Sequence, residues 1–312
     1  MTSNRADVRD FLVSRRAKIT PEQAGLQFYG GNRRVPGLRR EEVAMLAGVS
    51  ADYYTRLEKG YLSGVSDGVL EAIASALHLD EAEREHLVNL ARAANTSPAR
   101  AAARRTPQQL RPATRLILDG MTDTPAFVRN GRLDVLAANT LGQALYSPAF
   151  ALPGRPINLA RFRFLDPAAR EFYPDFGDSA NTTVALLRTE AGRDPFNKSL
   201  TDLIGELSTR SEEFRTMWAA HNVRLHRTGL KHFHHPVIGR IDLMFEAMAL
   251  EADDGLTLTA YTAEPGTPSH DALRLLASWA ATNMSESTGT ADPSPMAAGH
   301  SADRQLGPKF AS

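Results

Sequence analysis

Residues 35–60 read VPGLRREEVAMLAGVSADYYTRLEKG, and this stretch decides the fold of the N-terminal part of the chain. Two runs with helical periodicity, 39–47 and 51–59, are separated by a glycine. Two closely crossing helices need a small residue at the contact, which Ala44 provides. The tight turn between them needs a residue that tolerates a left-handed backbone, which Gly48 provides. The spacing therefore predicts a helix-turn-helix.

The side chains of this motif divide into an inner and an outer face. The expected inner positions are Val43, Ala47, Val49, Tyr54 and Leu57. Tyr54 is larger than the branched residue usual at its position, so we expect its ring to pack inside and its hydroxyl to reach the rim. Ser50 stands where the second helix needs an N-cap.

The outer face of the second helix carries groups that could read DNA bases, namely Ala51, Asp52, Thr55 and Arg56. In a major groove, Arg56 could donate two hydrogen bonds to guanine and Asp52 could accept one from cytosine. Asp52 could instead hold Arg56 in position, since the two are four residues apart. Phosphate contacts are expected from Arg39, Arg40, Ser50 and Tyr53, with Arg33 and Arg34 adding to them from the preceding loop.

Helical patterns on both sides of the motif complete a small domain. One covers 5–18, one begins after a cap at Ser66, and one begins at Asp80, where Glu83 completes a capping box. Residues 1–60 hold eleven Lys and Arg against seven Asp and Glu, although the whole chain has zero formal net charge. This excess suits a phosphate-binding surface. Paired helices also occur in proteins that never touch DNA, so a purely structural role stays open.

The character of the sequence changes beyond this all-helical part. A hairpin is expected around Asn130-Gly131, and strand patterns return at 231–250 and 255–263. Further helices are expected at 113–121, 140–146, 179–191, 198–207 and 211–222. A sheet of four or five strands with flanking helices is an α+β arrangement. The predicted division is a helix-turn-helix domain at 1–95, a linker at 96–112, an α+β domain at 113–280 and a disordered tail at 281–312.

Composition excludes several classes of protein. Cys is absent, which removes disulfides and thiol catalysis. No apolar run is long enough to span a membrane, and charges interrupt the N-terminus where a signal peptide would be apolar. We therefore expect a cytoplasmic protein. The chain also lacks G-x-S-x-G, a P-loop and G-x-G-x-x-G, so the sequence predicts no enzyme.

The segment VPGLRREEVAMLAGVS and the following YYTRLE resemble the XRE-type transcription regulators of the MmyB-like group. The resemblance continues through TDTPAFV, RLDVLAAN, NLARFRFLDPAAR, WAAH, HPVIG and YTAEPGTPS, and covers roughly residues 8–278. It implies a lambda-repressor-like DNA-binding domain of five helices, followed by a PAS-like domain that binds fatty acids or similar small apolar molecules. It also implies double-stranded operator DNA and a second copy of the chain as partners.

The second domain has a supply of Met and aromatic residues that could line an adaptable pocket: Phe127, Phe162, Phe164, Phe172, Tyr173, Phe176, Met217, Trp218, Phe233, Met244, Phe245 and Met248. The residues alone favour an ordinary core, whereas the resemblance favours the pocket. The ligand contacts expected are Phe164, Trp218 and Phe245, with Arg215, His221 or Arg224 holding a carboxylate. Asn139 fits a helix N-cap better than a ligand contact.

Four histidines lie close together in the sequence, at His226, His232, His234 and His235. Strand alternation places His232 and His234 on one face. Zinc sites need three or four ligands in fixed geometry, and no Cys is available to help. The HPVIG segment also accounts for His235 without a metal. No metal is therefore predicted, and no cofactor beyond a bound fatty acid or related lipid.

Together these features predict a ligand-responsive, sequence-specific DNA-binding regulator that acts as a homodimer. Two alternatives remain open. One is a constitutive DNA-binding protein whose second domain only dimerises. The other is an enzyme whose helix-turn-helix domain is regulatory.

Overall fold

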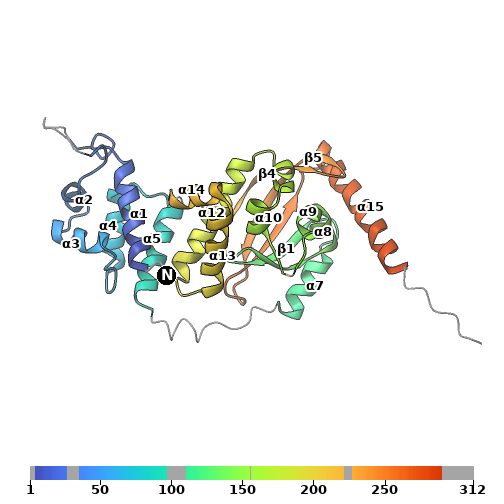
Figure 1. The fold of residues 1–312 in the computed structure, drawn as a ribbon, viewed down its shortest axis with the longest axis horizontal. Coiled ribbons are helices and arrows are strands. Elements are labelled where there is room, and N and C mark those ends of the chain that lie inside the picture. Colours follow the sequence, from blue (N-terminus) through green and yellow to red (C-terminus); the bar gives the residue numbers. More distant parts are fainter. Residues whose placement is uncertain (1–3, 27–34, 97–109, 155, 221–226, 290–312) are drawn as a thin grey trace, which may run out of the picture.

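The computed structural model describes residues 4–26, 35–96, 110–154, 156–220 and 227–289. The N-terminal part has five helices and the second part has an antiparallel sheet with its own helices. The molecule is elongated, with these two parts toward opposite ends (Figure 1). Three helices of the second part, α12, α13 and α14, lie between the sheet and the N-terminal helices (Figure 1). The expected order of an all-α part followed by an α+β part is confirmed.

The N-terminal helices are α1 (Asn4–Lys18), α2 (Arg40–Leu46), α3 (Ala51–Glu58), α4 (Asp67–Ala76) and α5 (Glu81–Ala94). Their starts follow the predicted caps. The Ser50 hydroxyl accepts from the Tyr53 N–H at 3.1 Å, and Ser66 caps α4 in the same way. At α5, the carboxylate of Asp80 accepts from the Glu83 N–H while that of Glu83 accepts from the Asp80 N–H. These caps fix the boundaries because they satisfy N–H groups that no helical turn can reach.

The sheet contains β1 (Ala126–Asn130), β2 (Asp134–Ala138), β3 (Ile157–Asn158), β4 (Thr228–His235), β5 (Gly239–Ala249) and β6 (Leu256–Thr262). Its spatial order is β3-β2-β1-β6-β5-β4, and all pairs are antiparallel. The predicted hairpin joins β1 to β2. The sheet has one strand more than expected, because β3 is only two residues long and two residues carry no alternation to detect.

Nine helices belong to this second part of the described chain: α7 (Pro112–Gly120), α8 (Thr140–Leu145), α9 (Ser147–Phe150), α10 (Leu159–Leu165), α11 (Ala168–Phe172), α12 (Phe176–Arg193), α13 (Lys198–Arg210), α14 (Glu212–Ala219) and α15 (Pro268–Gly289). The tail prediction is wrong for residues 281–289, which continue α15 as helix rather than forming a disordered segment. A helix already formed by the apolar residues before them extends at low cost, whatever the Ser-rich composition suggests. Residues 290–312 lie outside the described residues.

Side-chain alternation gives the sheet two apolar faces. On one face a group of buried residues that we name the sheet cluster joins Phe127, Phe233, Phe245 and Tyr261 to residues of α8, α10, α11 and α15. On the other face Ala126, Val128 and Leu258 pack with Leu118 of α7. A third group, the helical cluster, lies between α10, α12, α13 and α14 and includes Leu187, Leu203 and Phe214.

The two parts dock through α5 and α12. Gly192 permits close approach, because a Cβ there would lie 2.7 Å from the ring of His86. At the edge of this contact Arg227 pairs with Glu81 and with Glu85, both at 3.0 Å. Nearby, burial raises the pKa of Asp7 on α1 to about 6, although Arg188 of α12 opposes the shift. The α5–α12 interface therefore combines tight packing with charge complementarity.

Candidate functional site

The expected DNA-reading face lies on α3, at the end of the molecule away from the sheet (Figure 1). Asp52 and Arg56 are exposed, and Ala51, Tyr53 and Thr55 are half-buried. Within the described chain neither Asp52 nor Arg56 has a hydrogen-bond or ion-pair partner. No hydrogen bond or ion pair between Asp52 and Arg56 therefore supports the alternative in which Asp52 holds Arg56. Both side chains are available for contacts with a ligand.

The inner positions of the motif are filled largely as predicted. Ala44 is buried at the crossing, Gly48 adopts a left-handed φ of 65°, and Val43 and Leu57 are buried. Tyr54 differs from expectation. Its ring packs inside, but its hydroxyl is also buried and does not reach the rim. Burial, with the neighbouring Glu58 carboxylate, raises the pKa of this hydroxyl well above its ordinary value.

A buried carboxylate that was not predicted from the sequence holds α3 against α1 and α2. Glu58 is 1% exposed. One of its oxygens accepts from Arg16 Nε at 2.7 Å and the other accepts from Arg40 Nε. Arg16 also donates to the carbonyl of Leu38 at 2.8 Å. Arg16 on α1 and Arg40 on α2 thus converge on α3, and we name this arrangement the Glu58 clamp.

The residues predicted to contact phosphate fall around the same helices. Arg39 is exposed, and its backbone N–H donates to the Glu42 carboxylate at 2.6 Å. Arg40 is half exposed, although its Nε is held by Glu58. Ser50 is exposed and uses its hydroxyl as the α3 cap. Arg33 and Arg34 lie outside the described residues.

The residues predicted to contact a ligand do not form one group. Phe164 and Trp218 both pack against Phe214 in the helical cluster, with ring centroids 5.0 and 5.6 Å apart. Phe245 belongs instead to the sheet cluster. Arg215 is exposed and pairs with Glu212 at 3.4 Å. His221 and Arg224 lie outside the part of the chain that the structure describes.

The sheet cluster contains a dense group of rings centred on Tyr146. Its ring lies 5.3 Å from Phe127 and 5.8 Å from Phe233, measured between centroids. Its hydroxyl is hydrogen-bonded to that of Tyr261 at 2.6 Å. Burial raises the pKa of both hydroxyls above their ordinary value. These tyrosines are therefore neutral donors and acceptors inside an aromatic interior.

Three basic side chains enter the same interior. Arg163 of α10 lies over the Tyr173 ring at 3.2 Å from its centroid. Lys231 of β4 lies over Phe245 at 4.7 Å, and its Nζ is 3.4 Å from the Tyr261 hydroxyl. Arg129 of β1 is 8% exposed. Burial lowers the pKa of all three, and with the added repulsion of Arg163 and Arg129 the pKa of Lys231 falls to about 7.

Two family models match the chain. The MmyB-like transcription regulator ligand binding domain matches residues 110–276, which is more than half of the sequence. The chain belongs to the MmyB-like transcription regulators. A helix-turn-helix domain matches residues 15–87 and covers the α2–α3 pair. A search of the curated proteins finds no match. The chain is thus a DNA-binding transcription regulator with a ligand-binding domain.

Asn139 of this MmyB-like regulator has the structural role that its position suggested. Its side-chain oxygen accepts from the N–H groups of Gly142 and Ala126, at 2.7 and 3.0 Å. Its amide donates to the carbonyls of Met121 and Thr124, both at 2.7 Å. All the polar atoms of the side chain are therefore used in joining α8 to β1 and to the segment before β1, and the N-cap prediction is confirmed.

Two of the clustered histidines of the MmyB-like regulator have separate partners. His232 Nδ1 lies 2.6 Å from an oxygen of Asp242, whereas His235 is buried against the Ala144 carbonyl at 2.9 Å. His234 is exposed, and His226 lies outside the described residues. Among the residues that the structure describes, no three His, Cys, Asp or Glu side chains are grouped so that they could hold a metal. The described helices also include none with the length and hydropathy of a membrane span.

A cleft of about 790 Å³ opens between the two parts of the MmyB-like regulator. Its walls come from the start of α1, from α3 and α5 near their ends and the residues that follow them, and from the α12–α13 connection with the first turns of α13: Asn4, Arg5, Arg56, Gly60, Tyr61, Ser63, Ala93, Ala94, Thr96, Pro195, Phe196, Lys198, Thr201 and Asp202. Arg56 is thus both on the candidate reading face and at the border between the two parts.

Proposed function

We propose that this MmyB-like regulator binds its operator as a homodimer through α3, and that a fatty acid or similar amphipathic molecule in the C-terminal domain controls that binding. The observation that carries the proposal is the position of α12. One side of α12 contributes Val184 and Leu187 to the helical cluster of the ligand-binding domain. Its other side docks on α5 of the DNA-binding domain. A change inside the ligand-binding domain therefore has a direct route to the helices that would meet DNA.

The DNA-binding half of the proposal rests on the division of roles around α3. Arg56 and Asp52 are exposed and have no partner among the described residues, which suits contacts with base edges. Arg39, Arg40 and Tyr53 lie beside them, where contacts with the phosphate backbone would fall. The Glu58 clamp holds α3 against α1 and α2, so the reading face keeps its shape before DNA arrives.

The regulatory half rests on Arg188. This buried side chain of α12 lies over the Trp218 ring of α14 at 4.1 Å and donates to the Trp218 carbonyl. It also opposes, by its charge, the raised pKa of Asp7 on α1. Arg188 thus contacts the helical cluster and acts by its charge on the first helix of the DNA-binding domain. A ligand that prefers one arrangement of α12 and α14 would shift the α5–α12 interface, provided that its affinity differs between the two arrangements.

Selection of bound fragments from random DNA, with and without a lipid extract, tests the proposal. The expected result is a palindromic consensus whose recovery changes when the lipid is added. Native mass spectrometry of gently purified protein identifies any bound ligand and the oligomeric state. An empty domain that ignores added fatty acids would favour the constitutive regulator, and turnover surviving deletion of residues 1–95 would favour the enzyme.

A further inference from the structure

The three cations of the sheet cluster lack the counter-charges that buried cations normally have. No carboxylate forms an ion pair with Arg129, Arg163 or Lys231 within the described part of the chain. The carboxylate of Glu190 on α12 attracts Arg129 electrostatically without forming an ion pair with it. Buried charges are generally paired, because an unpaired charge is strongly unfavourable in a medium of low polarity.

Strand registers place two of these cations, Arg129 and Lys231, on one face of the sheet. Lys231 is opposite Leu243, two positions from the Gly229–Phe245 pair, and Phe245 is in turn opposite Tyr261. Arg129 is two residues from Phe127, and so shares its face. Arg163 reaches the same space from α10 on the helical side, as its contact with Tyr173 shows. The cations therefore surround a common region from three directions.

Two polar atoms in this region also lack partners. Arg163 is 6% exposed, and its Nε has no hydrogen-bond acceptor among the described residues, although its Nη1 contacts Ser179. Thr259 is 3% exposed and shares the Tyr261 face, and its hydroxyl is equally unpartnered within that part of the chain. Buried polar groups without partners are uncommon in folded proteins, and they mark positions where another group is expected.

We infer that Arg129, Arg163 and Lys231 form a binding site for the anionic group of a small molecule, a carboxylate or a phosphate, whose apolar part lies among the aromatic side chains of the sheet cluster. The inference rests on the proposed function of this domain as a ligand sensor. It replaces Arg215, which is exposed and paired with Glu212, as the holder of the anionic group.

The chemistry of the site fits an amphipathic anion. The guanidinium groups can donate paired hydrogen bonds to a carboxylate or a phosphate, and Lys231 adds a point charge. The Tyr261 hydroxyl, already 3.4 Å from Lys231 Nζ, can supply a neutral donor. Lys231 lies on β4 at the edge of the sheet and is only partly buried, which leaves a side from which a ligand can approach.

Binding of four probes to the full-length protein tests the inference: laurate, lauryl phosphate, lauryl alcohol and inorganic phosphate. Laurate or lauryl phosphate should bind about ten- to a hundredfold more tightly than the alcohol, because only they satisfy the cations. The ratio between the first two shows which anion the site prefers. Binding of inorganic phosphate alone with equal affinity would remove the apolar part of the inference.

Lys231→Met and Arg163→Met should each reduce the preference for laurate over lauryl alcohol by about tenfold, while the affinity for the alcohol changes little. Lys198→Met is the matched control, because Lys198 is exposed, lies on α13 and pairs with Asp202. Removal of an uncompensated cation should also raise Tm, so loss of binding through unfolding is recognised at once. The comparison with Arg163→Met covers the case in which one variant fails to fold.

Equal affinity of the wild-type protein for laurate and lauryl alcohol overturns the inference. It is also overturned if the Lys231→Met and Arg163→Met variants both keep the full preference for laurate. If the alcohol and laurate bind equally and both change DNA binding, the proposed regulatory function stands without this anion site. If no lipid probe binds, the proposed function of the domain fails together with the inference.

Discussion

Lys231 illustrates how one position on a strand sets the chemistry of a side chain. Alternation along β4 turns it to the face of Phe233, where burial and two arginines lower its pKa to about 7. A bound anion would raise that pKa again, so binding above about pH 7 requires uptake of a proton. Laurate affinity should therefore fall as the pH rises above about 7, by at most roughly tenfold per pH unit.

Calorimetric titration with laurate across this pH range measures the effect. Lys231→Arg is the matched control, because a guanidinium stays charged throughout the range and should give a nearly constant affinity. An unchanged affinity of the wild-type protein up to about pH 9 would show that Lys231 does not meet the anion. In the free protein the same lowered pKa makes folding stability rise with pH between about 7 and 10.5, since the unfolded chain binds the extra proton.

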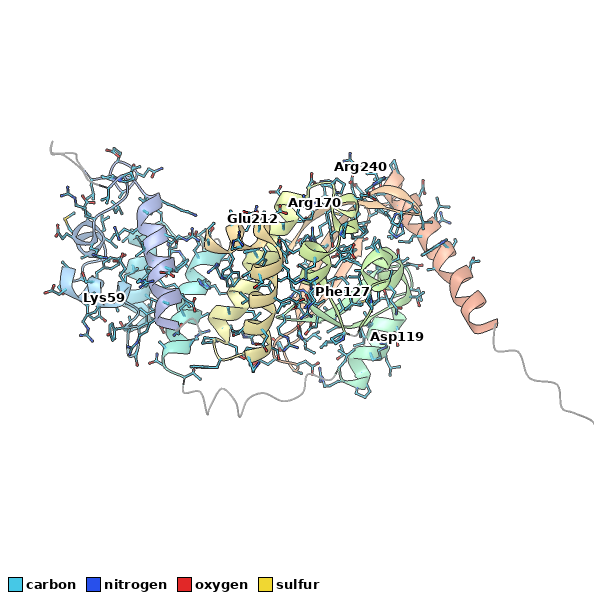
Figure 2. The ribbon with its side chains drawn as sticks, viewed as in Figure 1. Lys59, Asp119, Phe127, Arg170, Glu212 and Arg240 are labelled. Carbon is cyan, nitrogen blue, oxygen red and sulfur yellow. The ribbon has the colours of Figure 1, made fainter. Side chains whose placement is uncertain are left out.

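Arg56 is the residue on which specificity for DNA should depend most. It is exposed, four positions after Asp52 on the outer face of α3, and has no partner among the described residues. Arg56→Ala should cost about 1–3 kcal/mol on the preferred operator and relax selection at one base pair of each half-site. Competition between variant operators measures this. Arg240→Ala is the control, since Arg240 and Lys59, the C-cap of α3, lie toward opposite ends of the molecule (Figure 2). Wild-type ranking of all operators would place the reading face elsewhere.

At the scale of elements, α3 depends on the Glu58 clamp more than on its own eight residues. A helix this short has little stability by itself, so the contacts of Glu58 with Arg16 and Arg40 decide its position. Glu58→Gln leaves two guanidinium groups without a counter-charge and should lower the free energy of unfolding by about 3 kcal/mol. Thermal and urea unfolding measure the change, with Glu41→Gln at an exposed site of α2 as the control. Equal stability of both variants would mean that the clamp is not a structural element.

Elements with local signals could be predicted from the sequence. Gly48, Ser50 and the Asp80–Glu83 box fix the N-terminal helices through short-range rules, and the Asn130-Gly131 hairpin is equally local. Periodicity shows which face of an element is apolar, but it does not show what that face meets. For this reason Phe164 and Trp218 could not be separated from Phe245 before the structure placed them in different clusters.

The candidate anion site shows the same limit more sharply. Arg129, Arg163 and Lys231 are separated by long stretches of chain, and Arg and Lys are ordinarily exposed residues. Glu58 was missed for the same reason, because a charged residue at the end of a short helix is ordinarily taken to be solvated. Whether a charged side chain has a partner depends on the tertiary structure. The spacing of residues in the sequence therefore could not reveal the clamped carboxylate or the unpaired cations.

At the scale of the whole molecule, the ion pairs of Arg227 with Glu81 and Glu85 bridge the two parts directly. They are exposed, so each contributes only about 0.2–1 kcal/mol, which is enough to tune the docking without controlling folding. Arg227→Glu replaces two attractions with repulsions and should weaken the α5–α12 interface. If that interface transmits the ligand signal, the variant should bind operator normally while the change caused by laurate shrinks several-fold.

Operator titrations with and without laurate measure this coupling. A charge-swapped variant that adds Glu81→Arg and Glu85→Arg to Arg227→Glu restores the attraction and should restore the response. Recovery of the response would show that Arg227→Glu acts by weakening the α5–α12 interface and not by damaging the ligand-binding domain, because the added substitutions lie on α5. A full response in Arg227→Glu would mean that the signal reaches α3 by another route. A lost response that the swapped charges do not restore would assign Arg227 a role within its own domain.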